Sequence, residues 1–311
     1  MAAKRVLILG DRGKLGTAMG LALAPDCQVL GRNRDHFEAS DPAQVEAVVR
    51  DGRPDVVVNC VARLGLDECQ RQPEQALRLN TLLPQQLAGL AGELGFTLVH
   101  FSTDSVFPDL EGEGFFTESS PPRPLNLYGL TKLGGDCLLA ATAARHYIFR
   151  VPVIFGPARS GTQFVERLLA RARRGERLRV TSDVVYTPSY SLDLAAEAAR
   201  VLMAGLPFGL YHLANQGRAS LYDLMAALVE CLGLKAPVEP VSHRQFPGLA
   251  VKNLRSPLAS EKLPPLRPWP EALESYCRDF LAVPAGASGA CRAPGPGGIL
   301  EQTSAALAVA P

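Results

Sequence analysis

Three side chains able to take part in proton transfer lie in the middle of the chain. An apolar run at residues 98–101 predicts a buried strand, and polar residues including Thr103 and Asp104 follow at its end. Tyr128 and Lys132 come later at a spacing of four in a predicted helix, so they share one helix face. A phenol titrates near pH 10, and lowering its pKa toward 7 requires about 4 kcal/mol of stabilisation of the phenolate. A neighbouring ammonium group and the positive ring of a bound cofactor favour that charged form, so we predict that Tyr128 donates a proton to a carbonyl oxygen.

A tyrosine and a lysine at this spacing are common in helices, so the context of the pair decides its meaning. The chain opens with a predicted strand at residues 4–9, followed by Gly10, Gly13 and Gly16 and then by a helical stretch that reaches Leu23. Gly10 permits a tight turn, Gly13 lets backbone amides approach a pyrophosphate, and Gly16 lets the helix pack closely on the strand. A strand, a glycine loop and a helix in this order predict nucleotide binding.

The residues after the second predicted strand indicate which nicotinamide cofactor would bind. An NAD site usually has an acidic residue there, which holds the ribose hydroxyls. This chain has the sequence Gly31, Arg32, Asn33 and Arg34 instead. The absence of an acidic residue and the presence of guanidinium groups at this position favour the binding of a 2′-phosphate. We therefore expect NADPH, contacted by Arg12 and Arg32, with NADH as the alternative.

Together the glycine loop, the strand ending in Ser-Thr and the Tyr-x-x-x-Lys pair resemble the extended short-chain dehydrogenase/reductase family. Within it the resemblance is to the dTDP-4-dehydrorhamnose reductase branch, which also includes the regulatory β subunit of methionine adenosyltransferase. It covers about residues 4–281. The resemblance implies that Thr103, Tyr128 and Lys132 occupy the positions of a catalytic triad.

The resemblance also implies roles for further residues. In the family, the segment matching residues 59–62 lies along the nicotinamide riboside, and an asparagine matching Asn80 helps to hold the active-site strand. The predicted cofactor-binding residues are Gly10, Arg12, Gly13, Lys14, Leu15, Gly16, Arg32, Asn59, Cys60, Val61, Ala62, Asn80, Tyr128 and Lys132. The predicted substrate-binding residues are Asp104, Asn126, Val153 and Asp183.

Composition restricts the function classes. The 311 residues carry 32 basic and 31 acidic side chains, and this balance argues against a nucleic acid or an anionic membrane as partner. Seven scattered cysteines without a Cys-x-x-Cys pair argue against a disulfide framework and against a zinc site, so we predict no metal. No apolar stretch approaches twenty residues, and we expect a cytoplasmic protein.

We expect an α/β fold: a Rossmann-type, doubly wound parallel sheet with a smaller C-terminal α/β portion. Residues 1–156 would mainly form the NAD(P)-binding domain, and residues 157–281 would mainly form the substrate-binding portion, with strands and helices free to interleave. Residues 282–311 are dominated by Ala, Gly, Pro and Ser, which predicts a disordered tail.

Two functions of different classes fit this pattern. The first is an NADPH-dependent reductase of a nucleotide-linked 4-keto-6-deoxy sugar, and the sequence leaves open whether it forms a homodimer. The second is a non-catalytic, NADP-binding regulatory subunit that serves a partner enzyme, because such a protein can retain the triad residues. Consumption of NADPH with a 4-keto sugar nucleotide separates the two.

Overall fold

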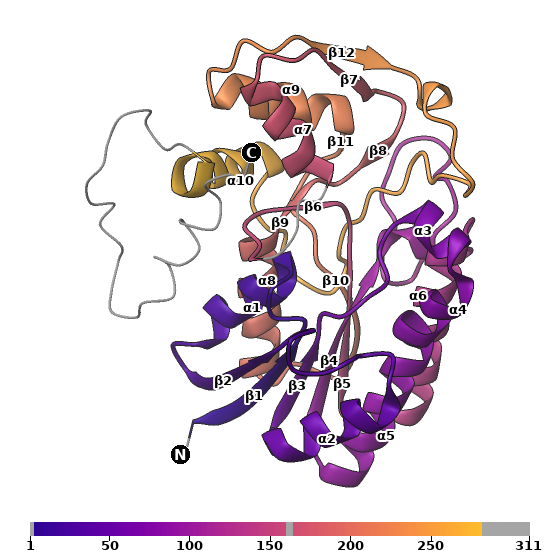
Figure 1. Cartoon of the computed structure of the whole chain (residues 1–311), viewed down its shortest axis with the longest axis vertical. Coiled ribbons are helices and arrows are strands. Elements are labelled where there is room, and N and C mark those ends of the chain that lie inside the picture. Colours follow the sequence, from indigo (N-terminus) through magenta and orange to yellow (C-terminus); the bar gives the residue numbers. More distant parts are fainter. Residues whose placement is uncertain (1–2, 160–163, 282–311) are drawn as a thin grey trace.

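A six-stranded parallel sheet forms the centre of the molecule in a computed structural model that describes residues 3–159 and 164–281 (Figure 1). The strand order is β10-β5-β4-β3-β1-β2. The strands are β1 (Lys4–Leu9), β2 (Cys27–Arg32), β3 (Val56–Asn59), β4 (Thr97–Thr103), β5 (His146–Val151) and β10 (Gly209–His212). The predicted Rossmann-type parallel sheet is confirmed.

Helices cover both faces of this sheet, because its strands are apolar on both sides. Side chains such as Val6 and Ile8 pack against one face's helices, whereas Leu7 and Leu9 pack against those of the other face. The first face carries α1 (Lys14–Leu23) and α8 (Ser191–Met203). The second carries α2 (Pro42–Gly52), α5 (Leu83–Leu94) and α6 (Leu127–Thr142).

The order of the strands determines where a ligand can bind. Strand β1 lies between β2 and β3, so the chain runs outward from β1 in both directions along the sheet. Parallel sheets of this kind bind ligands beyond the carboxyl ends of the strands, at the point where the order reverses. The glycine loop follows β1, and Thr103 is the last residue of β4, so both lie at this edge.

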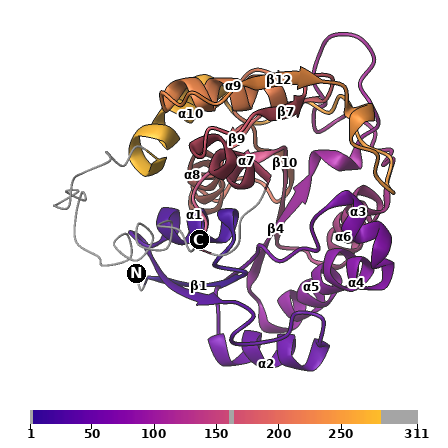
Figure 2. The same cartoon turned by 45° about the horizontal axis from the view of Figure 1, so that its top comes forward.

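A second lobe lies beyond the carboxyl end of the sheet (Figure 2). Its helices are α7 (Phe164–Arg173), α9 (Leu221–Cys231) and α10 (Trp269–Tyr276). Its strands are β6 (Ile154–Phe155), β7 (Leu178–Thr181), β8 (Val185–Tyr186), β9 (Ser189–Tyr190), β11 (Ala219–Ser220) and β12 (Val238–Val241), which pair as β6-β9, β7-β12 and β8-β11. It has its own hydrophobic core, in which the aromatic rings of Phe155, Tyr190 and Tyr276 pack together.

The two parts of the chain interleave. Helix α8 and strand β10 come after residue 156, yet both belong to the large sheet and its helical layers.

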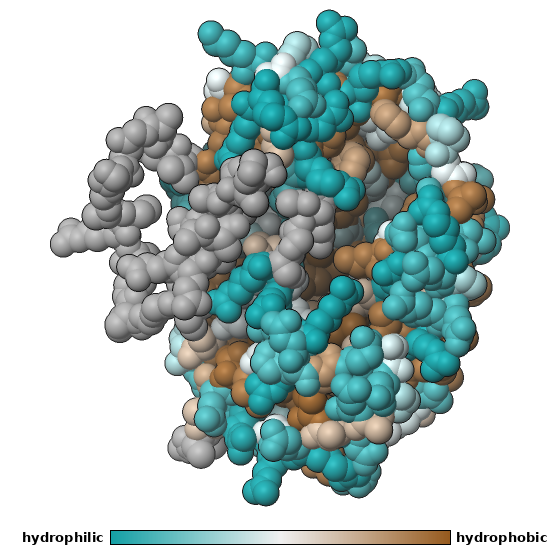
Figure 3. Space-filling view, viewed as in Figure 1, coloured by the Kyte–Doolittle hydropathy of each residue, from teal (hydrophilic) through white to brown (hydrophobic). Residues whose placement is uncertain are grey.

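The space-filling view shows a hollow near the centre of the face that it displays (Figure 3). The remaining short helical segments are α3 (Leu66–Arg71), α4 (Pro73–Leu77), η1 (Arg78–Leu82), η2 (Asp104–Val106), η3 (His243–Gln245) and η4 (Cys277–Leu281).

The predicted tail at residues 282–311 lies outside the described residues. Within residues 3–159 and 164–281, no helix is long and apolar enough to cross a membrane.

Candidate active site

The loop after β1 is shaped for close contact with a ligand. Gly10 has a φ of +83°, in the region that favours glycine, and a Cβ on Gly16 would lie only 2.2 Å from the Gly10 carbonyl oxygen. Gly13 is the N-cap residue of α1 and supplies no side-chain cap. The first amides of α1 are therefore available to an anion, and the helix dipole favours negative charge there. This geometry fits the pyrophosphate of a dinucleotide.

The end of β2 carries both signs of charge. Arg12 forms an ion pair of 2.6 Å with Asp35, and the Arg32 guanidinium donates to its neighbouring carbonyl. Asp11 accepts a hydrogen bond of 2.9 Å from Asn33. The sequence analysis missed this carboxylate, because it comes from the glycine loop and not from the end of the second strand. Asp11 opposes the two arginines in attracting a 2′-phosphate.

The side chain of Lys14 contacts the second lobe. It is 5% exposed, forms an ion pair of 2.8 Å with Glu166 of α7 and donates to the carbonyl of Ile154. Burial lowers the pKa of Lys14, and Glu166 acts in the opposite direction. The side chain of Lys14 is therefore occupied by these partners, and cofactor binding by this residue stays a prediction. Leu15 is partly buried against the hydrophobic core, and the backbone amides of both residues lie at the start of α1.

Thr103 and Asp104 form a hydrogen-bonded pair at the end of β4. The Thr103 hydroxyl donates to Asp104 over 3.0 Å, and the Ser256 hydroxyl donates to the other carboxylate oxygen over 2.9 Å. Burial raises the pKa of Asp104 to about 6, although these hydrogen bonds favour the charged form. A hydroxyl carries one proton, so Thr103 donates either to Asp104 or to a substrate oxygen.

Tyr128 lies in the first turn of α6, close to Thr103. The helix begins at Asn126, whose side chain accepts a hydrogen bond of 2.9 Å from the Gly129 amide. Burial raises the pKa of Tyr128 above its ordinary value, and a hydrogen bond with Thr103 only partly opposes this effect. The lowering of this pKa is predicted for Lys132 acting together with a bound cofactor, whereas in the protein without a cofactor the pKa is raised.

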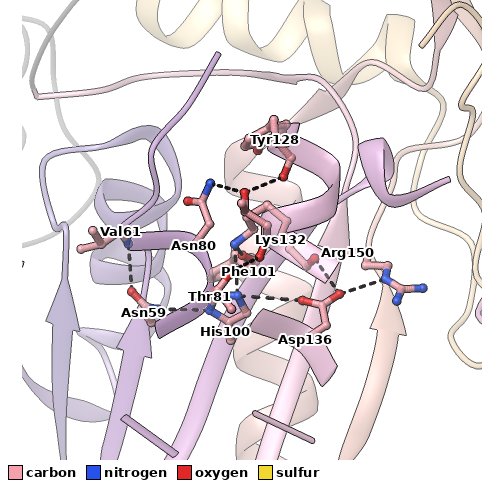
Figure 4. Close-up of polar contacts among 12 residues, drawn as sticks. Asn59, Val61, Asn80, Thr81, His100, Phe101, Tyr128, Lys132, Asp136 and Arg150 are labelled. Atoms are coloured by element: carbon pink, nitrogen blue, oxygen red, sulfur yellow. Dashed lines mark hydrogen bonds and ion pairs between the residues drawn. The ribbon is translucent and has the colours of Figure 1, made fainter. Parts of the chain in front are cut away.

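The side chain of Lys132 explains this difference. Its Nζ atom donates to the carbonyl of Phe101 on β4 over 2.6 Å and lies 3.1 Å from the Nε2 atom of His100 (Figure 4). Lys132 is 1% exposed, and burial lowers its pKa to about 8, while Asp136 acts in the opposite direction. The lysine is thus engaged with the strand below it.

A buried polar network that the sequence analysis did not predict continues from Lys132. Asp136 accepts hydrogen bonds from Ser102 at 2.8 Å and from the Arg150 guanidinium at 3.3 Å. Burial raises the pKa of Asp136, and Arg150 opposes this shift most strongly. A signal existed in the sequence, because Asp136 follows Lys132 by four residues and His100 interrupts an apolar strand.

The segment after β3 lies beside the glycine loop, as expected for cofactor-binding residues. A Cβ on Gly10 would be 3.2 Å from the backbone of Cys60 and 3.3 Å from the side chain of Val61. Asn59 is buried, and its side-chain oxygen accepts from the Val61 amide over 3.1 Å. Ala62 continues this segment and is partly exposed.

Asn80 is used internally. It is fully buried in η1, where its amide bonds both the N–H and the carbonyl of Arg63 and also the hydroxyl of Thr131 on α6. These bonds hold the loop after β3 against α6. Direct contact with the cofactor is therefore not supported, and Asn80 positions the site instead.

Two predicted substrate-binding residues have structural roles. Besides capping α6, Asn126 donates to Asn253 and to the carbonyl of Val251, so its amide is fully occupied. Asp183 accepts hydrogen bonds from Ser242 and from His243, which lower its pKa to about 2 against the raising effect of burial. Asn126 is buried and has a structural role, whereas the Asp183 side chain is 37% exposed, and the contacts of both residues with a substrate stay predictions.

The other two predicted substrate-binding residues remain at the site. Asp104 is next to Thr103, and its contact with Ser256 ties the end of β4 to the C-terminal segment. Val153 is partly exposed just before β6, and its carbonyl accepts from the Ser189 amide. Their contacts with a substrate stay predictions.

Comparison with known proteins places this geometry in context. The family model described as RmlD substrate binding domain matches residues 4–282. The dTDP-4-dehydrorhamnose reductase of Escherichia coli is 34% identical over 72% of this chain and 77% of that protein. The enzyme of the same name from Mycolicibacterium smegmatis is 30% identical over 92% of this chain and 88% of that protein. The crystal structure of dTDP-4-dehydrorhamnose reductase from Bacillus anthracis in complex with NADP has a TM-score of 0.84 at 24% identity and covers 90% of this chain and 100% of that chain.

Proposed function

Because the chain belongs to the RmlD substrate binding domain family, we propose that it is an NADPH-dependent reductase of a nucleotide-linked 4-keto-6-deoxy sugar, similar to dTDP-4-dehydrorhamnose reductase. The observation that supports this proposal is that Thr103 and Tyr128 lie close together at the carboxyl end of the parallel sheet, where the glycine loop also lies. A proton donor and a dinucleotide site on one edge of a sheet are what carbonyl reduction requires.

The chemistry divides between the cofactor and the chain. The nicotinamide, when bound, supplies the hydride. Tyr128 supplies the proton to the carbonyl oxygen of the sugar. Thr103 stabilises the developing oxyanion when its hydroxyl turns from Asp104 toward the substrate. Lys132 contributes the positive charge that makes the phenol a better acid.

The preference for NADPH is proposed from the charges at the end of β2. Arg12 of the glycine loop and Arg32 at the end of β2 supply positive charge there, and β2 itself carries no carboxylate that competes for a ribose hydroxyl. Asp11 reduces the advantage, so we expect NADH to bind as well, but more weakly.

We also propose a cytoplasmic location. Cys69 and Cys277 are buried free thiols, and such thiols persist in a reducing compartment. A homodimer stays a prediction. The regulatory alternative, with a partner enzyme, has no support among the named relatives, which are reductases.

The purified protein should be tested with NADPH and a panel of nucleotide-linked 4-keto-6-deoxy sugars, and cofactor oxidation followed by absorbance. We expect turnover with the dTDP-linked sugar and none without it. Tight NADPH binding without turnover of any sugar in the panel would contradict the reductase and favour the regulatory subunit.

A further inference from the structure

His100 is a fully buried histidine that the chemistry proposed above does not use. It lies on β4, and its ring faces α6. Its two ring nitrogens have different neighbours: Nδ1 is 3.1 Å from the amide nitrogen of Asn59, and Nε2 is 3.1 Å from Nζ of Lys132 (Figure 4). The histidine therefore connects a predicted cofactor-binding segment to a predicted catalytic lysine.

The surroundings of Asn59 determine where the proton of His100 resides. The Val61 N–H can only donate, so it fixes the side-chain oxygen of Asn59 in the orientation seen here. The NH₂ group of Asn59 then donates to Nδ1 of His100, and Nδ1 must offer its lone pair. Burial keeps the pKa of His100 well below its ordinary value. The neutral ring accordingly carries its proton on Nε2.

This tautomer discriminates between the two forms of Lys132. An ammonium group has donors only, so it would oppose the Nε2–H of His100 at 3.1 Å. A neutral amine has a lone pair and accepts that hydrogen bond. The Phe101 carbonyl accepts from either form. The other tautomer of His100 would require the Asn59 amide to turn over and to break its bond with Val61.

The remaining groups around Lys132 allow a proton to enter and leave near physiological pH. Burial lowers the pKa of Lys132 to about 8, against the opposite effects of Asp136 and Cys60. One oxygen of Asp136 lies 4.0 Å from Nε2 of His100, and its other oxygen bonds Arg150. The titratable and charged groups around this cluster are His100 on β4, Cys60 after β3, Asp136 and Tyr128 on α6, Arg150 on β5, Cys69 on α3, and Asp11 and Asp104 at the ends of β1 and β4.

We propose that His100 is a positioning residue that favours the neutral amine of Lys132 in the buried position, and that Lys132 leaves this contact and becomes fully protonated, with a proton from solvent, when NADPH binds. The proposal rests on the proposed function for the identity of the cofactor. Its consequence is that the positive charge next to Tyr128 is complete only in the loaded enzyme, and that the difference between the free and the loaded protein grows from pH 7 to pH 9. Before loading, burial keeps the phenol a weak acid.

Proton uptake on NADPH binding tests the proposal without any turnover. Calorimetric titrations in two buffers of different ionisation enthalpy give the number of protons taken up. With a pKa of about 8, roughly one tenth of Lys132 is neutral at pH 7 and roughly nine tenths at pH 9. We expect the wild type to take up about 0.1 proton at pH 7 and about 0.9 at pH 9.

Two variants assign this proton. In His100→Gln, a side-chain carbonyl can accept from an ammonium group, so Lys132 stays charged in the free protein and uptake at pH 9 should fall below about 0.3 proton. Lys132→Met should abolish the uptake. His212→Gln is the matched control, because it removes another buried imidazole from β10 and should behave like the wild type.

Uptake below about 0.2 proton by the wild type at pH 9 would overturn the proposal, as would equal uptake by His100→Gln and the wild type. If His100→Gln does not fold, Asn59→Ser, which frees the ring to change its tautomer, should show the same reduced uptake, and wild-type uptake by this variant would count against the proposal. If the protein binds only NADH, we expect the same numbers of protons to be taken up on NADH binding. Failure to reduce any sugar contradicts the proposed function alone, because these titrations contain no sugar.

Discussion

Replacing Asp104 with asparagine should remove a pH-dependent loss of stability. The carboxyl group is 6% exposed, and its pKa is raised to about 6 from an ordinary value of 3.8. The folded protein thus binds this proton more tightly than the unfolded chain does. The resulting stabilisation is fully present below pH 3.8 and is lost as the pH rises through 6. Asparagine cannot ionise, so the stability of Asp104→Asn should not fall in this way as the pH rises.

The shift of about two pKa units corresponds to about 3 kcal/mol of unfolding free energy. About 2 kcal/mol of this falls between pH 4.5 and pH 8, because part of the change occurs at lower pH. The hydrogen bonds need not be lost on substitution. The amide oxygen can still accept from Thr103, and the NH₂ group can donate to the Ser256 hydroxyl.

Urea denaturation followed by circular dichroism at several pH values measures this effect. The unfolding free energy of Asp104→Asn minus that of the wild type should rise by about 2 kcal/mol between pH 4.5 and pH 8. Asp183→Asn is a control that should show no such rise: the pKa of Asp183 is lowered to about 2, so the stabilisation by its carboxylate is already complete above about pH 4.5 and is lost only at lower pH. A free-energy difference for Asp104→Asn that stays flat or falls with pH would refute the reasoning.

Three further predictions concern the site and its scaffold. Tyr128→Phe should bind NADPH normally but reduce the sugar 10²- to 10⁴-fold more slowly in steady-state assays, and unchanged turnover would remove the proton-donor role. Asp11→Asn should increase the preference for NADPH over NADH in fluorescence titrations. Arg32→Ala should reduce the difference in binding free energy between the two cofactors by about 1 to 3 kcal/mol. No change in either variant would show that these charges do not face the ribose. Gly135→Ala should lower the melting temperature, because its Cβ would lie 2.1 Å from a backbone carbonyl of η1, whereas Gly92→Ala on α5 has open space and should not; equal melting temperatures would argue against this close packing.

The parts of the fold that depend on local sequence could be predicted. Strand β1 and helix α1 occupy the predicted residues, because an apolar run, a glycine loop and a helical period are all visible within twenty positions. The same holds for Thr103 at the end of β4 and for Tyr128 in the first turn of α6. The predicted family, which depends on these motifs, is confirmed by the match to residues 4–282.

The features of the site that depend on contacts between distant residues could not be predicted from the sequence. The direction of the Lys132 side chain follows from His100, which is 32 positions away. Asn126 and Asp183 are polar residues in family-like motifs, but their partners come from the segment at residues 242–253, which no local pattern pairs with them. Asp11 was overlooked because the acidic residue was expected on the second strand, whereas the fold brings one from the glycine loop.

Transfer of the hydride itself is the most direct test of the proposed reductase. NADPH carrying deuterium at the transferable C4 position should be incubated with the protein and the dTDP-linked 4-keto-6-deoxy sugar, and the product analysed by mass spectrometry and NMR. We predict one deuterium at C4 of the sugar and an equal amount of NADP⁺. Recovery of the unreduced sugar without deuterium, from protein shown to bind both ligands, would contradict the proposed function.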